Sequence, residues 1–310
     1  MRVLVTGAGG FLGQHIMAKL IRAGYQVTAL SRRHLGEYNA GLVVDLSEPL
    51  KASIVKDFDI IIHLAGTVNV SDMLKEPAKN IMNNVGCTLN LLEDVRLNNP
   101  QCLFVYMSSD RVYGLQASGT ANEDSVCVPS DPYSASKLIS EELVRGYHGA
   151  YGIGFLIFRA GNTFGPGQPE GLFIPSVIAK IVSGTDEIRV GNLDAYRNFL
   201  YVEDLAEAVL LCLKKGIMNQ ILNLSAYNYR ISDVLDVIVR EASSMTGRKL
   251  KIVQDPLLFR KNEKDSRVLL DCAKIRSYGW KPKKEFSQAI RTTLSAALGI
   301  DSSADVLLDK

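Results

Sequence analysis

The sequence of 310 residues has little net charge, few aromatic residues and no long hydrophobic run. Its formal net charge is only +2, and lysine and arginine are scattered, so the basic stripe that nucleic acid or an anionic membrane requires is missing. The sequence contains no run of about 18 apolar residues, which is the length needed to cross a bilayer. The N-terminus passes directly into the strand-like segment RVLVT, without the pattern of a signal peptide. We therefore expect a soluble cytoplasmic protein with no nucleic-acid or membrane partner.

Cysteine is also sparse. The five cysteines are isolated, with no CxxC pair and no histidine cluster nearby, which argues against a disulfide framework and a zinc site. We expect no metal, and reduced, mostly buried thiols. They are Cys87, Cys102, Cys127, Cys212 and Cys272.

What the sequence does contain is an alternation of short apolar runs with longer amphipathic segments. Alternation of this kind predicts βαβ units and a parallel sheet covered on both faces, which is a doubly wound α/β domain. The first helix is predicted over 11–23, where apolar residues share a broad face and Gly24 follows as a C-terminal stop. The predicted strands are 3–5, 27–30, 42–44, 60–64, 103–106 and 155–158.

After about residue 165 the composition and the spacing of the predicted elements change. Glycine and proline cluster in FGPGQPEG, the strands become short, and helical patterns at 232–244 and 285–297 are separated by loops. We predict a dinucleotide-binding domain of residues 1–165 plus about 195–220, and a smaller substrate-binding lobe of about 166–194 and 221–299. Residues 300–310 form a tail.

A glycine-rich loop joins the first predicted strand to the first helix. Gly7, Gly10 and Gly13 fit the spacing GxxGxxG. Glycines there permit a tight turn and close approach of the backbone to a pyrophosphate, and the helix N-terminus offers free N–H donors. Between them, Phe11 and Leu12 open the helix. The loop predicts a Rossmann-type dinucleotide site, whereas a purely structural turn would need fewer glycines.

The end of the second predicted strand reads Ser31-Arg32-Arg33. An acidic side chain there would bind the ribose hydroxyls of NAD, whereas guanidinium groups can bind the 2'-phosphate of NADP. We therefore favour NADP(H), with NAD(H) possible, and the alternative is a solvated arginine pair. Asp45 and Leu46 follow the third strand and could border adenine, or Asp45 could cap a helix beginning near Ser47.

A second constellation comprises the sequence MSSDRVYG (107–114), at the end of a predicted buried strand, and Tyr133 with Lys137. Four positions apart on a helix, these two side chains share a face, so the lysine ammonium could lower the pKa of the phenol. The spacing alone means little. Asp110 and Arg111 either shape a sugar pocket or form an ion pair or a turn cap.

Taken together, these motifs resemble the extended short-chain dehydrogenase/reductase family (the NAD-dependent epimerase/dehydratase family), specifically its nucleotide-sugar-modifying branch. The resemblance covers nearly the whole chain. Two positions depart from it: Asn198 stands where an acidic residue is usual, and Cys87 where glycine is usual. Further matching segments are HLAG (63–66), NVGCTLNLLE (84–93), RAGNTFGPG (159–167), RNFLYVED (197–204), RKNE (260–263) and GWKP (279–282).

The resemblance implies roles for individual residues. Ser109 would hydrogen-bond the substrate oxygen, Tyr133 would act as acid or base, and Lys137 would bind the nicotinamide ribose and tune Tyr133, which suits a reaction that makes an oxyanion from a carbonyl. The nucleotide diphosphate and sugar would contact Ser108, Ser109, Asp110, Asn162, Arg197 and Arg260. The cofactor would additionally contact Leu64, Ala65, Gly66 and Asn84.

Three reactions share such a scaffold. A 4,6-dehydratase needs a base, but Arg111 occupies the position where the family carries it, and a guanidinium cannot abstract a proton at neutral pH. A 4-epimerase needs only the serine, tyrosine and lysine, but usually carries the acidic ribose ligand. We therefore predict NADPH-dependent reduction of a nucleotide-linked 4-keto-6-deoxy sugar to the 4-hydroxy sugar, with the NAD-dependent 4-epimerase as the alternative.

Two further expectations complete the sequence-based interpretation. A non-catalytic NADP(H) sensor is the alternative from another class, although such proteins tend to lose the Tyr-Lys pair. Members of the family often dimerise through two helices, which correspond here to about 71–97 and 132–147, so a homodimer is expected.

Overall fold

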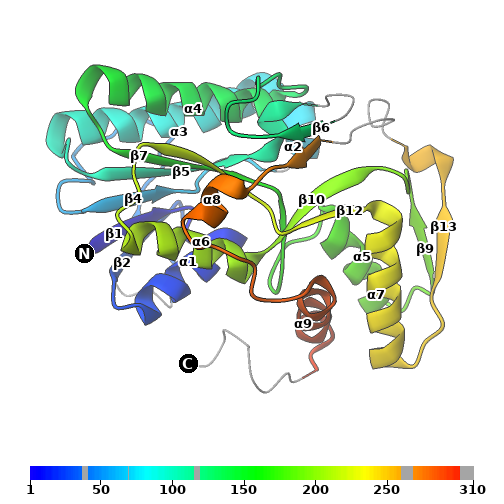
Figure 1. The fold of residues 1–310 in the computed structure, drawn as a ribbon. Helices are drawn as coiled ribbons and strands as arrows, with labels where there is room; N and C mark the ends of the chain where they lie inside the picture. The colour runs from blue at the N-terminus through cyan, green and yellow to red at the C-terminus, as the bar shows by residue number, and fades with distance from the viewer. Residues whose placement is uncertain (37–40, 69, 115–118, 260–267, 301–310) are drawn as a thin grey trace.

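The structure is a computed structural model that describes residues 1–36, 41–68, 70–114, 119–259 and 268–300. Its centre is a seven-stranded parallel sheet in the order β11-β7-β5-β4-β1-β2-β3 (Figure 1). This confirms the predicted doubly wound parallel sheet. The strands are β1 (Arg2–Thr6), β2 (Gln26–Ser31), β3 (Gly41–Val43), β4 (Ile60–His63), β5 (Leu103–Ser109), β7 (Phe155–Ala160) and β11 (Gln220–Leu224).

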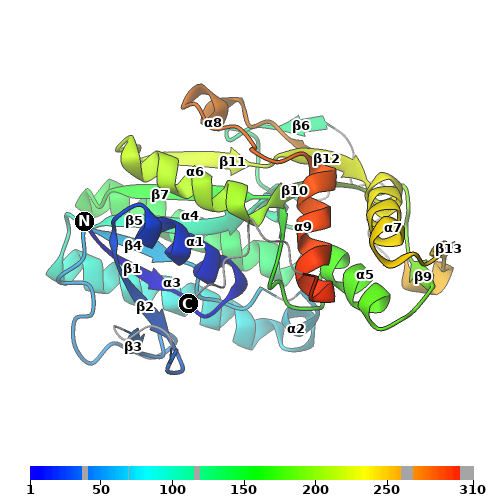
Figure 2. The same cartoon turned by 90° about the horizontal axis from the view of Figure 1, so that it is seen from below.

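The strands are apolar throughout because both faces of the sheet are covered. Successive residues point to opposite faces, so Val3 and Val5 pack with the side chains of α1 (Phe11–Arg22) and α6 (Val202–Lys214). Leu4 points the other way, toward α3 (Pro77–Asn98) and α4 (Pro132–Tyr151). Figures 1 and 2 show the two helix pairs on opposite sides of the sheet.

A smaller lobe lies beside the carboxyl ends of the central strands (Figure 1). It has its own core, in which aromatic rings of Phe164, Phe199 and Phe286 meet edge to face or tilted. The predicted helices at 232–244 and 285–297 are confirmed as α7 and α9. The lobe contains β8 (Asn162–Phe164), α5 (Phe173–Val182), β9 (Glu187–Val190), β10 (Tyr196–Tyr201), β12 (Tyr227–Arg230), α7 (Ile231–Thr246), β13 (Lys251–Gln254) and α9 (Phe286–Leu298).

The chain crosses between the two sheets at places that differ from the predicted division. The prediction placed β11 in the smaller lobe, whereas β11 pairs with β7 in the central sheet. It also placed β10 with the central domain, but β10 pairs with β8 and β12. The remaining elements are α2 (Val70–Lys75), the 3₁₀ turns η1 (Asp110–Tyr113) and η2 (Pro256–Leu258), β6 (Gly119–Ala121), β14 (Val268–Leu270) and α8 (Ala273–Ser277).

Within the described ranges, no helix is both long and apolar enough to cross a membrane. All five cysteines are free thiols, and four of them are buried. The single tryptophan, Trp280, is buried against the central core and donates its indole N–H to the carbonyl of Asp204 at 3.0 Å.

Candidate active site

The loops that follow β1 and β4 meet at the carboxyl edge of the central sheet. The strand order reverses here, because the chain runs from β1 to β2 and β3 on one side and then returns to β4 on the other. In open parallel sheets, ligands bind at such a reversal. The two loops approach so closely that a Cβ on Gly7 would lie 2.9 Å from the backbone nitrogen of Ala65.

The glycine-rich loop has the geometry that a diphosphate requires. Gly7 has φ +65°, in the left-handed region, and a Cβ on Gly13 would lie 2.5 Å from the carbonyl oxygen of Gly7. Helix α1 begins at Phe11 with Gly10 as its N-cap and no side-chain cap, which leaves its first N–H groups for a ligand. Phe11 and Leu12 are half-buried at the start of this helix. The loop therefore fits a dinucleotide.

A buried polar chain holds the segment after β4. The Thr6 hydroxyl accepts the N–H groups of Leu64 and Ala65, both at 3.2 Å, and lies 2.8 Å from Nδ1 of His63. Burial lowers the pKa of His63 to about 3, so its ring is neutral. Since the Thr6 oxygen already accepts twice, it donates to Nδ1. Gly66 continues this segment. The chain fixes the backbone beside the glycine-rich loop.

Asn84 lies beneath the same segment. Its side-chain oxygen accepts the N–H of Thr67 at 2.6 Å, and its amide group donates to the Thr67 carbonyl and the Ser136 hydroxyl at 3.1 Å each. The amide of Asn84, proposed from the sequence to contact cofactor, thus ties α3 and α4 to the loop after β4.

The residues proposed for cofactor selection lie at the ends of β2 and β3. Arg32 and Arg33 are exposed, and Ser31 forms a turn with Arg33. Asp45 accepts the Ser47 hydroxyl at 2.7 Å and the Ser47 N–H at 3.0 Å, and these bonds, with the nearby charge of Arg32, lower the pKa of Asp45. Asp45 therefore caps a turn, not a helix. Leu46 is buried.

Ser109 and Tyr133 come together at the end of β5. Ser109 is the last residue of β5 and the N-cap of η1, and its oxygen accepts the N–H of Arg111 at 3.3 Å. Tyr133 lies in the first turn of α4, whose N-cap Asp131 forms a capping box with Ser134. Burial raises the pKa of Tyr133 to about 12, opposed by the Ser109 hydroxyl and then by the charge of Arg111.

Lys137 follows one turn later on α4. Its ammonium donates to the Met107 carbonyl at 2.9 Å and lies 5.0 Å from the centre of the Tyr106 ring. Burial lowers the pKa of Lys137 to about 8, although the Glu141 carboxylate opposes this. In this structure the Ser109 hydroxyl and then the charge of Arg111 lower the pKa of Tyr133. That Lys137 also lowers it stays a prediction.

Ser108 points away from Ser109, into a buried ionic cluster. Its hydroxyl donates to Glu141, and the guanidinium of Arg159 pairs with the same carboxylate at 2.7 Å. Arg159 also donates to the hydroxyl of Tyr113 at 2.9 Å. Ser108, proposed from the sequence as a substrate contact, is 4% exposed and lies within this cluster.

Asp110 connects the end of β5 to the smaller lobe. Its carboxylate accepts the amide of Asn198 at 2.9 Å and the hydroxyl of Ser109 at 3.3 Å. Burial raises the pKa of Asp110, and the bond from Asn198 opposes the rise. The suggested ion pair between Asp110 and Arg111 is replaced by one between Arg111 and Asp131.

A cavity of about 210 Å³ lies in the smaller lobe and is bordered on the side of the central sheet by Arg111. Arg111, Asn162 and Arg197 line it together with apolar side chains of α5, including Phe173 and Ile174. Asn162 donates to the carbonyl of Asn198 at 3.1 Å. The guanidinium group of Arg197 in this cavity suits a diphosphate. Arg260, the third proposed clamp, lies outside the described residues.

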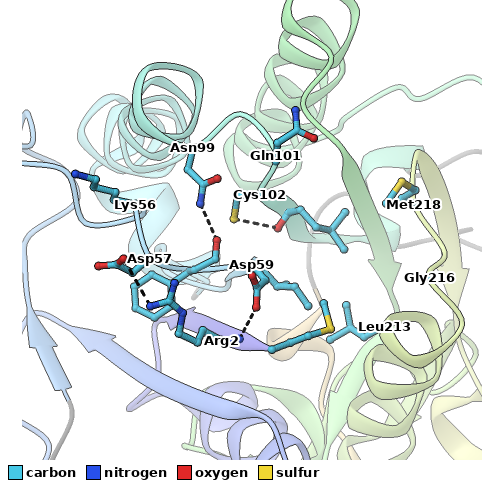
Figure 3. Close-up of a pocket in the computed structure, with 14 residues that line it drawn as sticks. Arg2, Lys56, Asp57, Asp59, Asn99, Gln101, Cys102, Leu213, Gly216 and Met218 are labelled. Carbon is cyan, nitrogen blue, oxygen red and sulfur yellow. Dashed lines mark hydrogen bonds and ion pairs between the residues drawn. The ribbon is translucent and has the colours of Figure 1, made fainter.

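A second cavity of about 490 Å³ lies at the opposite, amino-terminal edge of the sheet (Figure 3). Arg2 bonds Asp59 through its backbone N–H at 2.7 Å and lies 3.6 Å from Asp57, and Asn99 donates to the Phe58 carbonyl at 2.8 Å. None of the proposed site residues lines this cavity.

Sequence reasoning missed Asp131 and Asn198 as parts of the site. An Asp-Pro pair directly before Tyr133 is a recognisable helix start, so the cap was open to prediction, but its pairing with Arg111 was not. Asn198 was noticed only as a departure from the family pattern. Its contact with Asp110 joins residues that are 88 positions apart.

Comparison with known proteins gives the family. Residues 3–225 match the model of the NAD dependent epimerase/dehydratase family. The chain is 32% identical to GDP-6-deoxy-D-mannose reductase of Pseudomonas aeruginosa over 95% of this chain and 96% of that protein. It is 31% identical to a putative UDP-glucose 4-epimerase of Methanocaldococcus jannaschii over 94% and 97%. Proteins described as dTDP-glucose 4,6-dehydratases are also similar.

The fold is shared with solved members of the same group. The structure of RMD from Pseudomonas aeruginosa complexed with NADPH superimposes with a TM-score of 0.83, at 30% identity, over 96% of this chain and 99% of that chain. The predicted resemblance is thereby confirmed, and with it the class of nucleotide-sugar reductases, epimerases and dehydratases. This chain belongs to the NAD-dependent epimerase/dehydratase family.

Proposed function

We propose that this protein reduces a nucleotide-linked 4-keto-6-deoxy sugar to the 4-hydroxy sugar with NADPH. The observation that carries the proposal is the convergence of Ser109, Tyr133 and Lys137 at the end of β5, at the same edge of the sheet as the glycine-rich loop, with Arg111 where elimination would need a base. Similarity to GDP-6-deoxy-D-mannose reductase supports it.

The proposed mechanism assigns one task to each side chain. A bound NADPH would supply the hydride, and its diphosphate would be held by the glycine-rich loop. Tyr133 would donate the proton that the developing alkoxide requires, and its pKa near 12 keeps the phenol protonated at neutral pH. Ser109 would hold the same oxygen, and Lys137 would bind the cofactor ribose. Arg197 and Asn162, with Arg260, would bind the nucleotide diphosphate.

The epimerase remains the alternative, because it needs the same serine, tyrosine and lysine and because the chain is also similar to a putative UDP-glucose 4-epimerase. A dehydratase would need a base that Arg111 cannot provide. A sensor without chemistry would not need Ser109, Tyr133 and Lys137 together.

The deciding experiment offers purified protein NADPH and a nucleotide-linked 4-keto-6-deoxyhexose. Reduction predicts a stoichiometric loss of NADPH absorbance and a 4-hydroxy sugar as product. Interconversion of C4-epimeric nucleotide sugars without net loss of NADPH would contradict the proposal and favour the epimerase.

The cofactor preference is a separate prediction. Arg32 and Arg33 are exposed at the end of β2, where their guanidinium groups can reach a 2'-phosphate, so NADPH should bind tighter than NADH by tenfold or more, about 1.4 kcal/mol per tenfold. Dissociation constants measured by fluorescence titration test this. Equal affinity for both cofactors, or tighter NADH, would refute the assignment and leave NAD as the cofactor.

A homodimer is predicted through α3 and α4, which pack side by side on one face of the sheet (Figure 1). Met82 and Leu89 on α3, seven positions apart, are 70% and 37% exposed, and Ile139 on α4 is 44% exposed. A second copy would cover these apolar side chains. Light scattering should show a dimer at micromolar concentration, and Met82→Glu with Ile139→Glu should give a monomer. A monomeric wild-type protein would refute it.

The free thiols fit a reducing compartment, and we propose that the reaction takes place in the cytoplasm.

A further inference from the structure

Arg111 is held beside the two residues that would share the substrate oxygen. Its backbone N–H donates to the oxygen of Ser109 at 3.3 Å. Its guanidinium forms an ion pair with Asp131, the N-cap of the helix that carries Tyr133 in its first turn. One residue thus contacts the serine through its backbone and the tyrosine helix through its side chain.

The placement of this guanidinium is costly in itself. The side chain of Arg111 is 32% exposed, and its Nε atom is buried without a hydrogen-bond partner among the described residues. An unpaired buried donor lowers stability, so packing alone does not explain the position. The side chain also lines the cavity in which the substrate would lie.

We propose that Arg111 is a positioning residue for proton transfer: its guanidinium, anchored by Asp131, stabilises the phenolate that Tyr133 becomes when it gives its proton to the substrate oxygen. The inference rests on the proposed function, in which Tyr133 is the acid. NADPH would supply the hydride, as in the proposed function, and in the proton transfer the O–H bond of Tyr133 breaks as the new O–H bond of the product forms.

The other groups around the Tyr133 phenol disfavour its ionised form, so a nearby cation would stabilise the phenolate. Burial raises the pKa of Tyr133, and the negative charges of Asp110 and Asp131 raise it further, whereas the Ser109 hydroxyl and Arg111 lower it. The phenol of Tyr106, from β5, also interacts with Tyr133. Lys137 lies one turn along α4, and in this structure its ammonium donates to the Met107 carbonyl.

The test compares kcat and KM at pH 7 in three variants, with NADPH affinity as the check on folding. With a pKa near 12, the Tyr133 phenol is protonated at this pH. In Arg111→Gln the cation that favours the phenolate is gone. At pH 7 kcat should fall roughly 10-fold, because a phenol of higher pKa is a weaker acid.

Two further variants separate this effect from substrate binding and from loss of structure. Arg111→Lys keeps the positive charge and should keep kcat near its wild-type value. Arg197→Gln removes the other guanidinium of the same cavity and should raise KM without lowering kcat. An Arg111→Gln protein that binds NADPH and keeps its wild-type kcat overturns the proposal, as does an Arg111→Lys protein whose kcat falls as far as that of Arg111→Gln.

The outcome is separable from that of the proposed function. If the wild-type protein consumes no NADPH but interconverts C4 epimers, the reductase proposal fails. The same variants, measured on the epimerisation, still decide the role of Arg111, since a tyrosine must also give and take a proton there.

Discussion

Replacing Tyr133 by phenylalanine is expected to lower kcat roughly 100-fold to 10,000-fold, the usual share of general acid catalysis, with NADPH affinity nearly unchanged. The phenol is the group placed to give a proton beside Ser109, and its pKa near 12 leaves it protonated over the working pH range. The phenylalanine ring keeps the packing against the end of β5 and removes only the hydroxyl. Single-turnover NADPH oxidation measures the loss directly.

Two companion variants separate the proton donor from its neighbours. Lys137→Met should lower both NADPH affinity and kcat, because the same ammonium would bind the cofactor ribose and stabilise the phenolate of Tyr133. Ser109→Ala should cost less than the tyrosine variant, since it removes a hydrogen-bond donor and leaves the proton source in place. Near-normal turnover in Tyr133→Phe would refute the assigned acid.

The parts of the fold that local pattern encodes were predictable from the sequence. Runs of β-branched residues such as 60–64 mark buried parallel strands, and glycines at 7, 10 and 13 mark the turn into α1. Both features determine the structure of the few residues that contain them, so they can be recognised without knowing the rest of the fold. Strand β11 was missed because a short apolar run after residue 165 does not indicate which sheet it joins. That choice depends on long-range pairing with β7.

The candidate site divides in the same way. Ser109 and Tyr133 could be brought together by reasoning, because a strand end and the following helix start meet at one edge of a parallel sheet. The partners of Arg111 and Asp110 could not, since Asp131 and Asn198 lie 20 and 88 positions away and are set by packing between elements. Ser108 shows the same limit. It points to the opposite face of β5 from Ser109, and its partner there, Glu141, lies 33 positions away.

Removal of the buried carboxylate by Glu141→Gln is expected to lower the free energy of unfolding by about 3–5 kcal/mol, the usual cost of leaving one partner of a buried ion pair uncompensated. The Glu141 side chain is fully buried, and that of Arg159 is 4% exposed. Arg159 donates to both carboxylate oxygens, through Nε at 3.2 and 3.1 Å and through a terminal nitrogen at 2.7 Å. Its remaining bonds, to the Tyr113 hydroxyl and the Glu123 carbonyl, cannot neutralise the charge.

The adjacent residue on the same helix provides the matched control. Glu142 pairs with Arg145 at 2.7 Å, but both side chains are more than half exposed. Solvent screens that pair, so Glu142→Gln should change stability by only about 0.5 kcal/mol or less. Urea unfolding followed by circular dichroism measures both variants. Equal, small effects would show that Arg159 finds compensation without Glu141. A large loss confined to Glu141→Gln would show that this ion pair holds α4, and with it Tyr133 and Lys137, against β7.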